Sequence, residues 1–175
     1  MMKIITTPMC EDVLRISGLT DYQVVKPNEI KDADLAILLS ETKTDIPTLK
    51  IKLNTYSQLY ESINAICEKF NLKANDYIVD NIKKSIKKNS EKKMHRANIK
   101  VKVYSNFIKD TVLDMGYTVC DNEYDYVVCP DYLENTVTNK KNLIIIPSHK
   151  NVSTNIIERI NERYNLLERE LCMKH

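Results

Sequence analysis

Two cysteines lie at positions where a thiol could act as a nucleophile. Cys10 follows a short β-prone run and precedes a predicted helix that begins with two acidic residues. The positive end of a helix dipole lowers the pKa of a thiol placed there, although the neighbouring Glu11 opposes this effect. Cys129 ends one predicted strand and His149 follows the next, so this pair has the composition of a nucleophile and its base. The alternative is that the cysteines are buried and unreactive and that His149 only caps a helix.

A second group of candidates consists of polar side chains that directly follow predicted strands. In an open α/β sheet, ligands bind beyond the carboxyl ends of the strands, where hydroxyl groups and helix N-termini can hold a small polar or phosphorylated molecule. The alternative is that these side chains only cap the helices that follow. If the two halves of the chain faced each other, the side chains would line one cleft. The candidate ligand-binding residues are Thr7, Ser40, Glu41, Asn54, Thr55, Ser105, Asn106, Asp131 and Ser148.

A basic segment, Lys83 to Lys102, carries nine lysines and arginines against one acid, so the rest of the chain is net negative. Ile78, Ile82 and Ile86 predict that this segment begins as an amphipathic helix on the core. It could be a solvated helix and linker, dock on an acidic protein, or bind nucleic acid. The absence of interleaved aromatic residues disfavours a platform for single strands. The candidate partner-binding residues are Lys83, Lys84, Lys87, Lys88, Lys92, Lys93 and Arg96.

Strand and helix patterns alternate along the chain. The continuous apolar runs Leu35–Leu39 and Leu143–Ile146 are typical of strands buried on both faces, and the alternating run Leu49–Leu53 suits an edge. Further strands are predicted over residues 3–6, 22–25, 99–104, 117–120 and 124–129. Helices are predicted over residues 10–18, 55–70, 106–115 and 152–171, with a single helical turn over 27–31.

The second half of the chain repeats the order of elements in the first. Both glycines of the sequence, Gly18 and Gly116, close the first helix of a half, and Asp34 and Asp125 precede equivalent buried strands. The predicted fold is therefore α/β, with two Rossmann-like halves of mostly parallel strands and helices on both faces. The first half covers residues 1–72, a basic helical connector covers 73–98, and the second half with its long terminal helix covers 99–175.

The composition narrows the class of protein. Two glycines are too few for a glycine-rich phosphate loop. Five scattered cysteines without a C-x-x-C pair indicate neither a zinc framework nor a disulfide scaffold, and we expect no metal and no cofactor. No signal peptide is recognised, and no apolar run approaches the roughly 18 residues that span a bilayer. These features predict a cytoplasmic protein.

Two stretches resemble the methanogenesis marker proteins, a group restricted to methanogens, with the fifth marker protein as the first comparison to make. They run from Lys3 to Leu14 and from Leu38 to Lys43 together with Leu49 to Asn54, within about the first 65 residues. The resemblance implies a methanogen source and an accessory role in methanogenesis, such as maturation or activation of methyl-coenzyme M reductase or its cofactor. It implies no catalytic residues.

The leading interpretation is thus an accessory protein that binds a protein partner or a small ligand at the strand ends. The alternatives are an enzyme that uses Cys10, or Cys129 with His149, and a nucleic-acid-binding protein that uses the basic segment. Whether the protein is an enzyme stays open at this point.

Overall fold

The computed structural model describes residues 1–148 and 152–172. The chain forms two compact units. The N-terminal unit comprises Met1–Lys84 with Thr154–Ile156, and the C-terminal unit comprises Ser85–Ser153 with Ile157–His175. Each unit contains one four-stranded sheet in which all the pairings are parallel. The predicted α/β class with two similar halves is confirmed.

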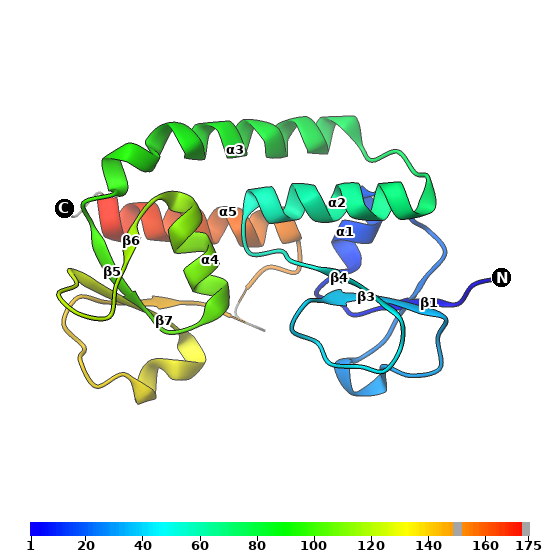
Figure 1. Cartoon of the computed structure of the whole chain (residues 1–175), viewed down its shortest axis with the longest axis horizontal. Coiled ribbons are helices and arrows are strands. Elements are labelled where there is room, and N and C mark those ends of the chain that lie inside the picture. Colours follow the sequence, from blue (N-terminus) through cyan, green and yellow to red (C-terminus); the bar gives the residue numbers. More distant parts are fainter. Residues whose placement is uncertain (149–151, 173–175) are drawn as a thin grey trace. The chain divides into compact units, whose positions relative to one another are not determined.

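In the N-terminal unit the strand order is β2-β1-β3-β4. Helices α1 and α2 lie on one side of this sheet, and η1 and the loop after it lie on the other (Figure 1). On that second side Ile5, Ala36 and Leu38 form a buried cluster covered by loop residues such as Ile30 and Ile46. The elements are β1 (Ile4–Thr6), α1 (Glu11–Ile16), β2 (Gln23–Val24), the 3-10 helix η1 (Pro27–Glu29), β3 (Leu35–Leu39), β4 (Thr48–Ile51) and α2 (Tyr56–Phe70).

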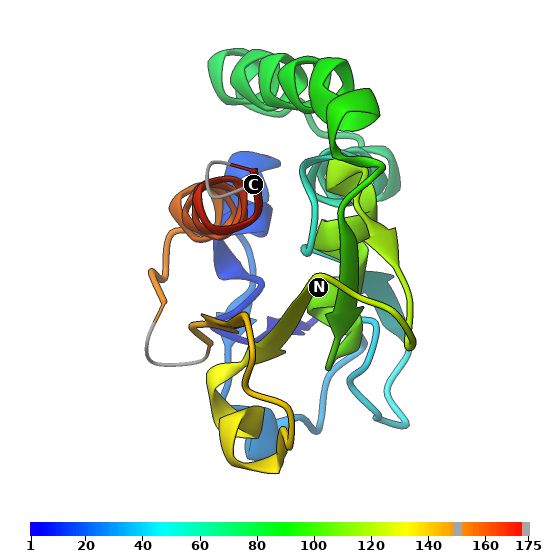
Figure 2. The ribbon, with the colours of Figure 1, turned by 90° about the vertical axis from the view of Figure 1, so that its left-hand side faces the viewer.

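The C-terminal unit has the matching strand order β6-β5-β7-β8. Figure 2 views this unit end on, with η2 and α5 on opposite sides of the sheet. Val137, which follows η2, is buried against Val127 and Cys129 of the central strand β7. The elements are β5 (Lys100–Val103), α4 (Asn106–Met115), β6 (Thr118–Val119), β7 (Tyr126–Pro130), the 3-10 helix η2 (Asp131–Thr136), β8 (Leu143–Ile146), α5 (Ile156–Leu167) and a π-helical end, η4 (Glu168–Cys172).

The repeat extends to individual hydrogen bonds. The backbone N–H of Lys3 donates to the carboxylate of Asp34 at 2.6 Å, and the N–H of Lys100 donates to Asp125 at 2.9 Å. In each unit an aspartate that directly precedes the central buried strand thus bonds the backbone at the start of the first strand, at Lys3 before β1 and at Lys100, the first residue of β5. Such a local, specific bond at equivalent places is what an internal duplication predicts.

Gly18 and Gly116 also hold equivalent positions. Both have positive φ angles, 84° and 95°. This left-handed backbone allows the N–H groups that follow a helix to bond its last carbonyls, and glycine adopts it without a Cβ clash. The N–H of Gly18 bonds Arg15 and that of Gly116 bonds Leu113, each at 3.0 Å. The two glycines of this glycine-poor chain therefore stand where the backbone requires them.

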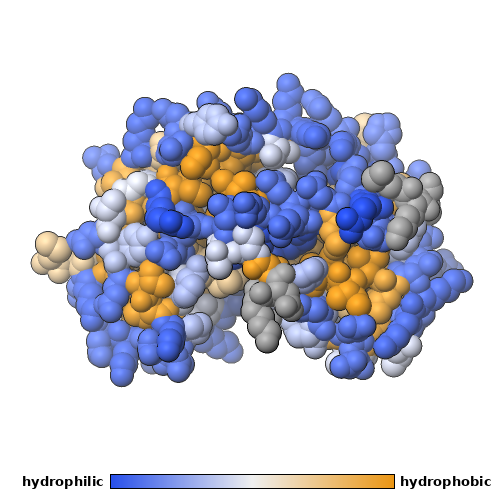
Figure 3. Space-filling view, turned by 180° about the vertical axis from the view of Figure 1, so that it is seen from behind, coloured by the Kyte–Doolittle hydropathy of each residue, from blue (hydrophilic) through white to orange (hydrophobic). Residues whose placement is uncertain are grey.

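Helix α3 (Asp76–Arg96) joins the two sheets along the chain. Ile82, Asn89 and Arg96 are its buried residues, seven positions apart, so its inward face changes from apolar to polar. Its outer face is mostly hydrophilic along the upper rim of Figure 3, although Tyr77 and Met94 are also exposed. Across the described residues, no helix has both the length and the hydropathy that a bilayer-crossing segment needs.

Candidate functional site

The two candidate nucleophilic cysteines are buried. Cys10 is the N-cap residue of α1 and is fully buried. Cys129 is likewise fully buried, inside β7. Burial, and then the nearby carboxylates of Glu134 and Asp131, raise the pKa of Cys129, which opposes formation of a thiolate at neutral pH. His149 lies outside the described residues. The surroundings of Cys129 thus match those of a structural cysteine.

In the N-terminal unit the strand-end candidates differ in exposure and contacts. Thr7 is buried, Ser40 is half-buried and Glu41 is exposed. Thr55 caps α2, because its hydroxyl accepts a hydrogen bond from the N–H of Gln58 at 3.0 Å. The Gln58 side chain returns a bond by accepting from the N–H of Asn54 at 3.0 Å. These two bonds of Asn54 and Thr55 are those of a helix cap.

In the C-terminal unit two candidates meet directly. Asp131 follows β7 and Ser148 follows β8, and these strands pair in a register that sets Pro130 opposite Ile146. One carboxylate oxygen of Asp131 accepts from the N–H of Ser148 at 3.1 Å, and the other accepts from its hydroxyl. Ser148 is buried, with 8% of its surface exposed. The carboxyl ends of β7 and β8 are thereby fixed to each other by side chains.

Ser105 and Asn106 lie at the end of β5, where α4 begins. The Ser105 hydroxyl caps the helix by accepting from the N–H of Ile108 at 3.4 Å. The backbone of Ser105 has φ 153° and ψ 151°, a region that residues other than glycine rarely occupy. Residues held in such conformations cluster at ligand-binding and active sites. This junction therefore belongs with Asp131 and Ser148 among the candidates.

A cavity of about 90 Å³ opens beside the end of β8. It begins at the residues just before Ser148 and is closed by one face of α5. Two arginines of α5, Arg159 and Arg163, stand four positions apart on that face. We call Asp131, Ser148, Arg159 and Arg163 the strand-end site. The lining residues of the cavity are Ile146, Pro147, Val152, Arg159, Glu162, Arg163 and Leu166.

The two arginines of the strand-end site differ in exposure: Arg159 is buried and Arg163 is half-buried. Arg159 is 6% exposed. The guanidinium of Arg163 lies 4.9 Å from the ring centroid of Phe107 and donates to the hydroxyl of Thr111 at 3.5 Å, so α4 supports it from the side. Burial, and then the like charge of Arg159, lower the pKa of Arg163 to about 10. Two arginines of α5, one buried and one half-buried, thus line the cavity.

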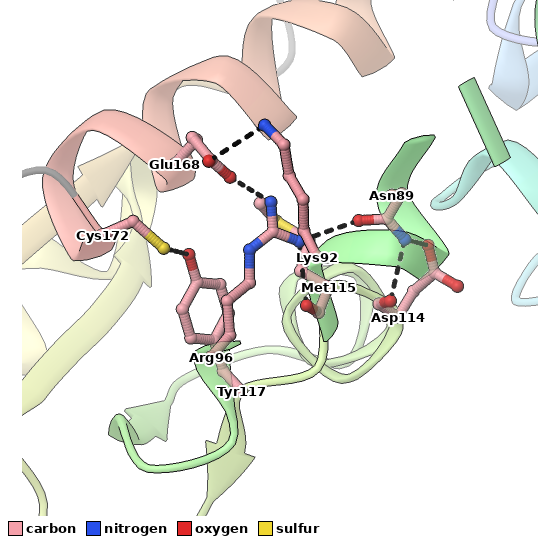
Figure 4. Close-up of polar contacts among 8 residues, drawn as sticks. All are labelled: Asn89, Lys92, Arg96, Asp114, Met115, Tyr117, Glu168 and Cys172. Atoms are coloured by element: carbon pink, nitrogen blue, oxygen red, sulfur yellow. Dashed lines mark hydrogen bonds and ion pairs between the residues drawn. The ribbon is translucent and has the colours of Figure 1, made fainter. Parts of the chain in front are cut away.

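A second polar cluster surrounds Arg96, at the end of α3 (Figure 4). Arg96 is 3% exposed and donates to Asn89 and to the carbonyl of Met115, each at 2.9 Å. It also pairs with Glu168 of η4, which Lys92 contacts at 3.2 Å. Partial burial alone would raise the pKa of Glu168, but the hydrogen bonds and charges of Lys92 and Arg96 outweigh it and lower this pKa. This cluster joins α3, α4 and η4 within the C-terminal unit.

The Arg96 cluster changes how the basic segment is interpreted. Arg96 is buried, Lys92 pairs with Glu168, and Lys93 lies 3.6 Å from a carboxylate oxygen of Asp114. These three candidate partner-binding residues are therefore engaged inside the unit. Of the candidate partner-binding residues, Lys83, Lys84, Lys87 and Lys88 are exposed on α3.

Sequence reasoning did not single out Arg159 and Arg163. The sequence did offer one sign of these residues: the two arginines are four positions apart, so they share a face of the helix that follows the last strand. Arg96 was grouped with the exposed lysines. Ile82, Asn89 and Arg96 are spaced seven residues apart, so they lie on one face of the helix. This spacing indicated that Arg96 faces inward with Ile82.

The chain is similar in fold to several solved structures, among them two metal-bound proteins. A Zn(II)-bound variant of AdcAII from Streptococcus pneumoniae matches with a TM-score of 0.64, at 13% identity, over 98% of this chain and 99% of that one. FpvC from Pseudomonas aeruginosa, in complex with Ni²⁺, matches with a TM-score of 0.63, at 11% identity, over 99% and 98%. The laminin-binding adhesin Lmb from Streptococcus agalactiae gives 0.62 at 10% identity, over 98% and 100%. At these identities the likeness concerns the fold.

The metal sites implied by those structures have no counterpart among residues 1–148 and 152–172. Within these ranges no three His, Cys, Asp or Glu side chains gather closely enough to hold a metal ion. The strand-end site instead presents two guanidinium groups, which repel a cation. Its donor set does not fit a metal.

A closer relationship in sequence comes from an archaeon. Residues 97–172 match the MJ0786 family C-terminal domain. The protein MJ0786 of Methanocaldococcus jannaschii is 30% identical over 173 residues, which cover 93% of this chain and 90% of that protein. The matched domain contains the strand-end site. The resemblance to the methanogenesis marker proteins stays a prediction, whereas the similarity to MJ0786 extends over nearly the whole length of both chains: this protein belongs to the MJ0786 family.

Proposed function

We propose that the protein binds a small polar ligand at the strand-end site of its C-terminal unit. The observation that carries this proposal is the convergence of Asp131 and Ser148 at the carboxyl ends of two neighbouring parallel strands, beside a cavity. Ligands of open α/β sheets bind at this edge. Two further observations support the proposal. Ser105 has a backbone conformation of the kind that clusters at ligand-binding sites, and two arginines of α5 line the cavity.

We propose that the protein has an accessory role in methanogenesis and acts in the cytoplasm of an archaeon. The relative in Methanocaldococcus jannaschii and the resemblance to the marker proteins support the methanogen source. The scattered cysteines favour a reducing compartment. Within this setting the ligand would link the protein to maturation or activation of methyl-coenzyme M reductase or its cofactor.

The test is equilibrium dialysis of the full chain against a small-molecule extract of methanogen cells, with mass spectrometry of the retained molecules. We expect the protein to concentrate one small polar molecule. Ser148→Ala removes one hydroxyl while keeping the backbone N–H that Asp131 accepts from. Because a hydrogen bond contributes about 0.5–1.5 kcal/mol, this variant should retain the molecule about 2- to 10-fold less well.

Thr136→Ala is the matched control. Its hydroxyl lies in the same unit but is exposed and bonds only locally, to the carbonyl of Leu133 at 2.7 Å in η2. This variant should bind like the unmodified chain. If no extract component is retained, or if both variants retain it equally, the proposed function is wrong.

An acidic protein partner is the second candidate. The exposure of Lys83, Lys84, Lys87 and Lys88 on one stretch of α3 favours it. A complex formed through these lysines should dissociate as salt is raised, because exposed charges separated by more than about 8–10 Å are screened at physiological ionic strength. A partner that stays bound in high salt would argue against this surface.

A further inference from the structure

We infer that the C-terminal unit has a second ligand site, which binds a sugar ring in a cavity at the starts of β7 and β8. Because these strands pair in parallel, the cavity lies at the opposite edge of the sheet from the strand-end site, so the inference goes beyond the proposed function. The volume of the cavity is about 280 Å³. Pockets that enclose drug-sized ligands measure about 300–1,000 Å³, so this one suits a single ring. Its lining residues are Tyr124, Asp125, Tyr126, Asn139, Lys141 and Asn142.

The duplicated N-terminal unit provides a comparison for these strand starts. The N–H of Ala36 in β3 donates to the carbonyl of Pro47 at 2.9 Å. In the C-terminal unit the N–H of Val127 in β7 donates to the carbonyl of Asn142 at 3.1 Å. Since the two bonds are equivalent, they align the two units residue by residue along both strand starts.

This alignment separates the residues that the fold requires from those that it does not. Asp125 matches Asp34, and each accepts a backbone bond at the start of a first strand. The other counterparts in the N-terminal unit are apolar: Ala33, Leu35, Ile46 and Pro47 stand where the C-terminal unit has Tyr124, Tyr126, Lys141 and Asn142. Ala33 and Ile46 pack on the buried cluster of their unit. The fold therefore requires the aspartate but not the aromatic and polar set, which we attribute to ligand binding.

Hydrogen bonds orient the polar side chains of the cavity. One carboxylate oxygen of Asp125 accepts from the N–H of Lys100 at 2.9 Å. The side-chain nitrogen of Asn142 donates to the carbonyl of Asp125 at 3.0 Å, so the amide oxygen of Asn142 is left as an acceptor. The side-chain nitrogen of Asn139 donates to the Tyr124 hydroxyl at 3.2 Å, and that hydroxyl keeps its own proton to donate. The cavity thus presents oriented acceptors together with a donor.

The charge of the lining favours an uncharged ligand. The lining carries one negative charge, on Asp125, and one positive charge, on the exposed Lys141, so it does not select an ion of either sign. A hydroxyl group both donates and accepts hydrogen bonds. Neighbouring hydroxyls of a sugar can therefore pair with the carboxylate, the amide oxygen and the ammonium group together. The half-buried ring of Tyr124 supplies apolar surface for the C–H groups of the sugar.

The test is backbone-amide NMR of the full chain, titrated with D-ribose, D-glucose and adenosine. At least one of these probes should shift the resonances of residues 124–126 and 139–142 in a saturable manner. Tighter binding of adenosine would assign the sugar to a nucleoside, and tighter binding of ribose or glucose would assign it to a free monosaccharide. The control probe is 2′,3′-dideoxyadenosine, which lacks the neighbouring hydroxyls and should bind more weakly than the best of the three.

Two variants remove single groups from the cavity. Tyr124→Phe loses one hydroxyl and keeps the ring, and Lys141→Met loses the ammonium group of an exposed side chain. Because a hydrogen bond contributes about 0.5–1.5 kcal/mol, each variant should weaken sugar binding about 2- to 10-fold. Lys140→Met is the matched control. It removes an equal charge from the next exposed residue, which does not line the cavity, and it should bind like the unmodified chain.

Three results would overturn the inference. They are the absence of saturable shifts with every sugar probe, shifts that lie at the strand-end site instead, and binding of 2′,3′-dideoxyadenosine that equals that of the sugar probes. Unchanged affinity in both Tyr124→Phe and Lys141→Met would contradict it as well. The proposed function is tested separately, by dialysis with Ser148→Ala, so either conclusion can fail without the other.

Discussion

Arg96→Met is expected to lower the free energy of unfolding by about 3 kcal/mol. The substitution leaves the Asn89 side chain and the carbonyl of Met115 without their buried donor and takes from Glu168 its closer cation. Removing one member of a buried ion pair costs about 3–5 kcal/mol, because the other charge is left uncompensated. We use the lower end since Glu168 is 29% exposed and keeps Lys92. In the described residues Arg96 Nε also has no acceptor, so the present network is not fully satisfied.

Urea denaturation monitored by circular dichroism measures this loss. Lys92→Met is the control, because Lys92 contacts the same carboxylate from the same helix but is 44% exposed. Exposed pairs contribute about 0–1 kcal/mol, so the control should change little. If Arg96→Met and Lys92→Met lowered the free energy of unfolding equally, the burial of Arg96 would not explain its contribution to stability.

Gly116→Ala is expected to destabilise the protein by about 3 kcal/mol. The φ angle of 95° costs an L-residue about 1–2 kcal/mol. A Cβ atom at this position would also lie 2.8 Å from both Cα and the carbonyl oxygen of Lys93. These are backbone atoms of α3, so the helix itself must move, and overpacking of this kind costs about 1–3 kcal/mol.

Gly18→Ala provides the internal comparison. Gly18 has φ 84°, but its added Cβ would meet only the carbonyl oxygen of Lys73, at 3.1 Å. Both variants therefore carry the cost of a positive φ angle, but the clash at Gly18 is milder. We expect Gly18→Ala to lower the free energy of unfolding by about 1–2 kcal/mol. Urea midpoints of the two variants measure the difference. Equal midpoint shifts would contradict the close contact between Gly116 and α3.

Much of the fold could be predicted from the sequence, because the strongest signals are local. The strand Leu35–Leu39 was predicted at its observed limits from an unbroken apolar run, and the helix ending at Met115 from the glycine after it. Two elements were missed. The 3-10 helix over Asp131–Thr136 is polar without a clear period, and the π-helical end over Glu168–Cys172 follows an ordinary helical pattern.

The candidate site was less predictable, since it depends on register and on side-chain burial. Asp131 and Ser148 were predicted separately as strand-end residues, but their contact follows from the pairing of Pro130 with Ile146. Arginines are usually exposed, so nothing in composition marked Arg159 or Arg96 as buried. The sequence contains the seven-residue spacing of Asn89 and Arg96 and the four-residue spacing of Arg159 and Arg163. These spacings identify buried residues only when it is known which face of each helix packs inward.

The central claim is that ligand binding occurs at the strand-end site of the C-terminal unit. Backbone-amide NMR of the full chain, titrated with the molecule retained in dialysis, tests it most directly. We expect the shifted resonances to cluster at Asp131, Ser148, Arg159 and Arg163, with smaller shifts at the start of α4. Shifts confined to the exposed lysines of α3 or to the N-terminal unit would contradict the claim.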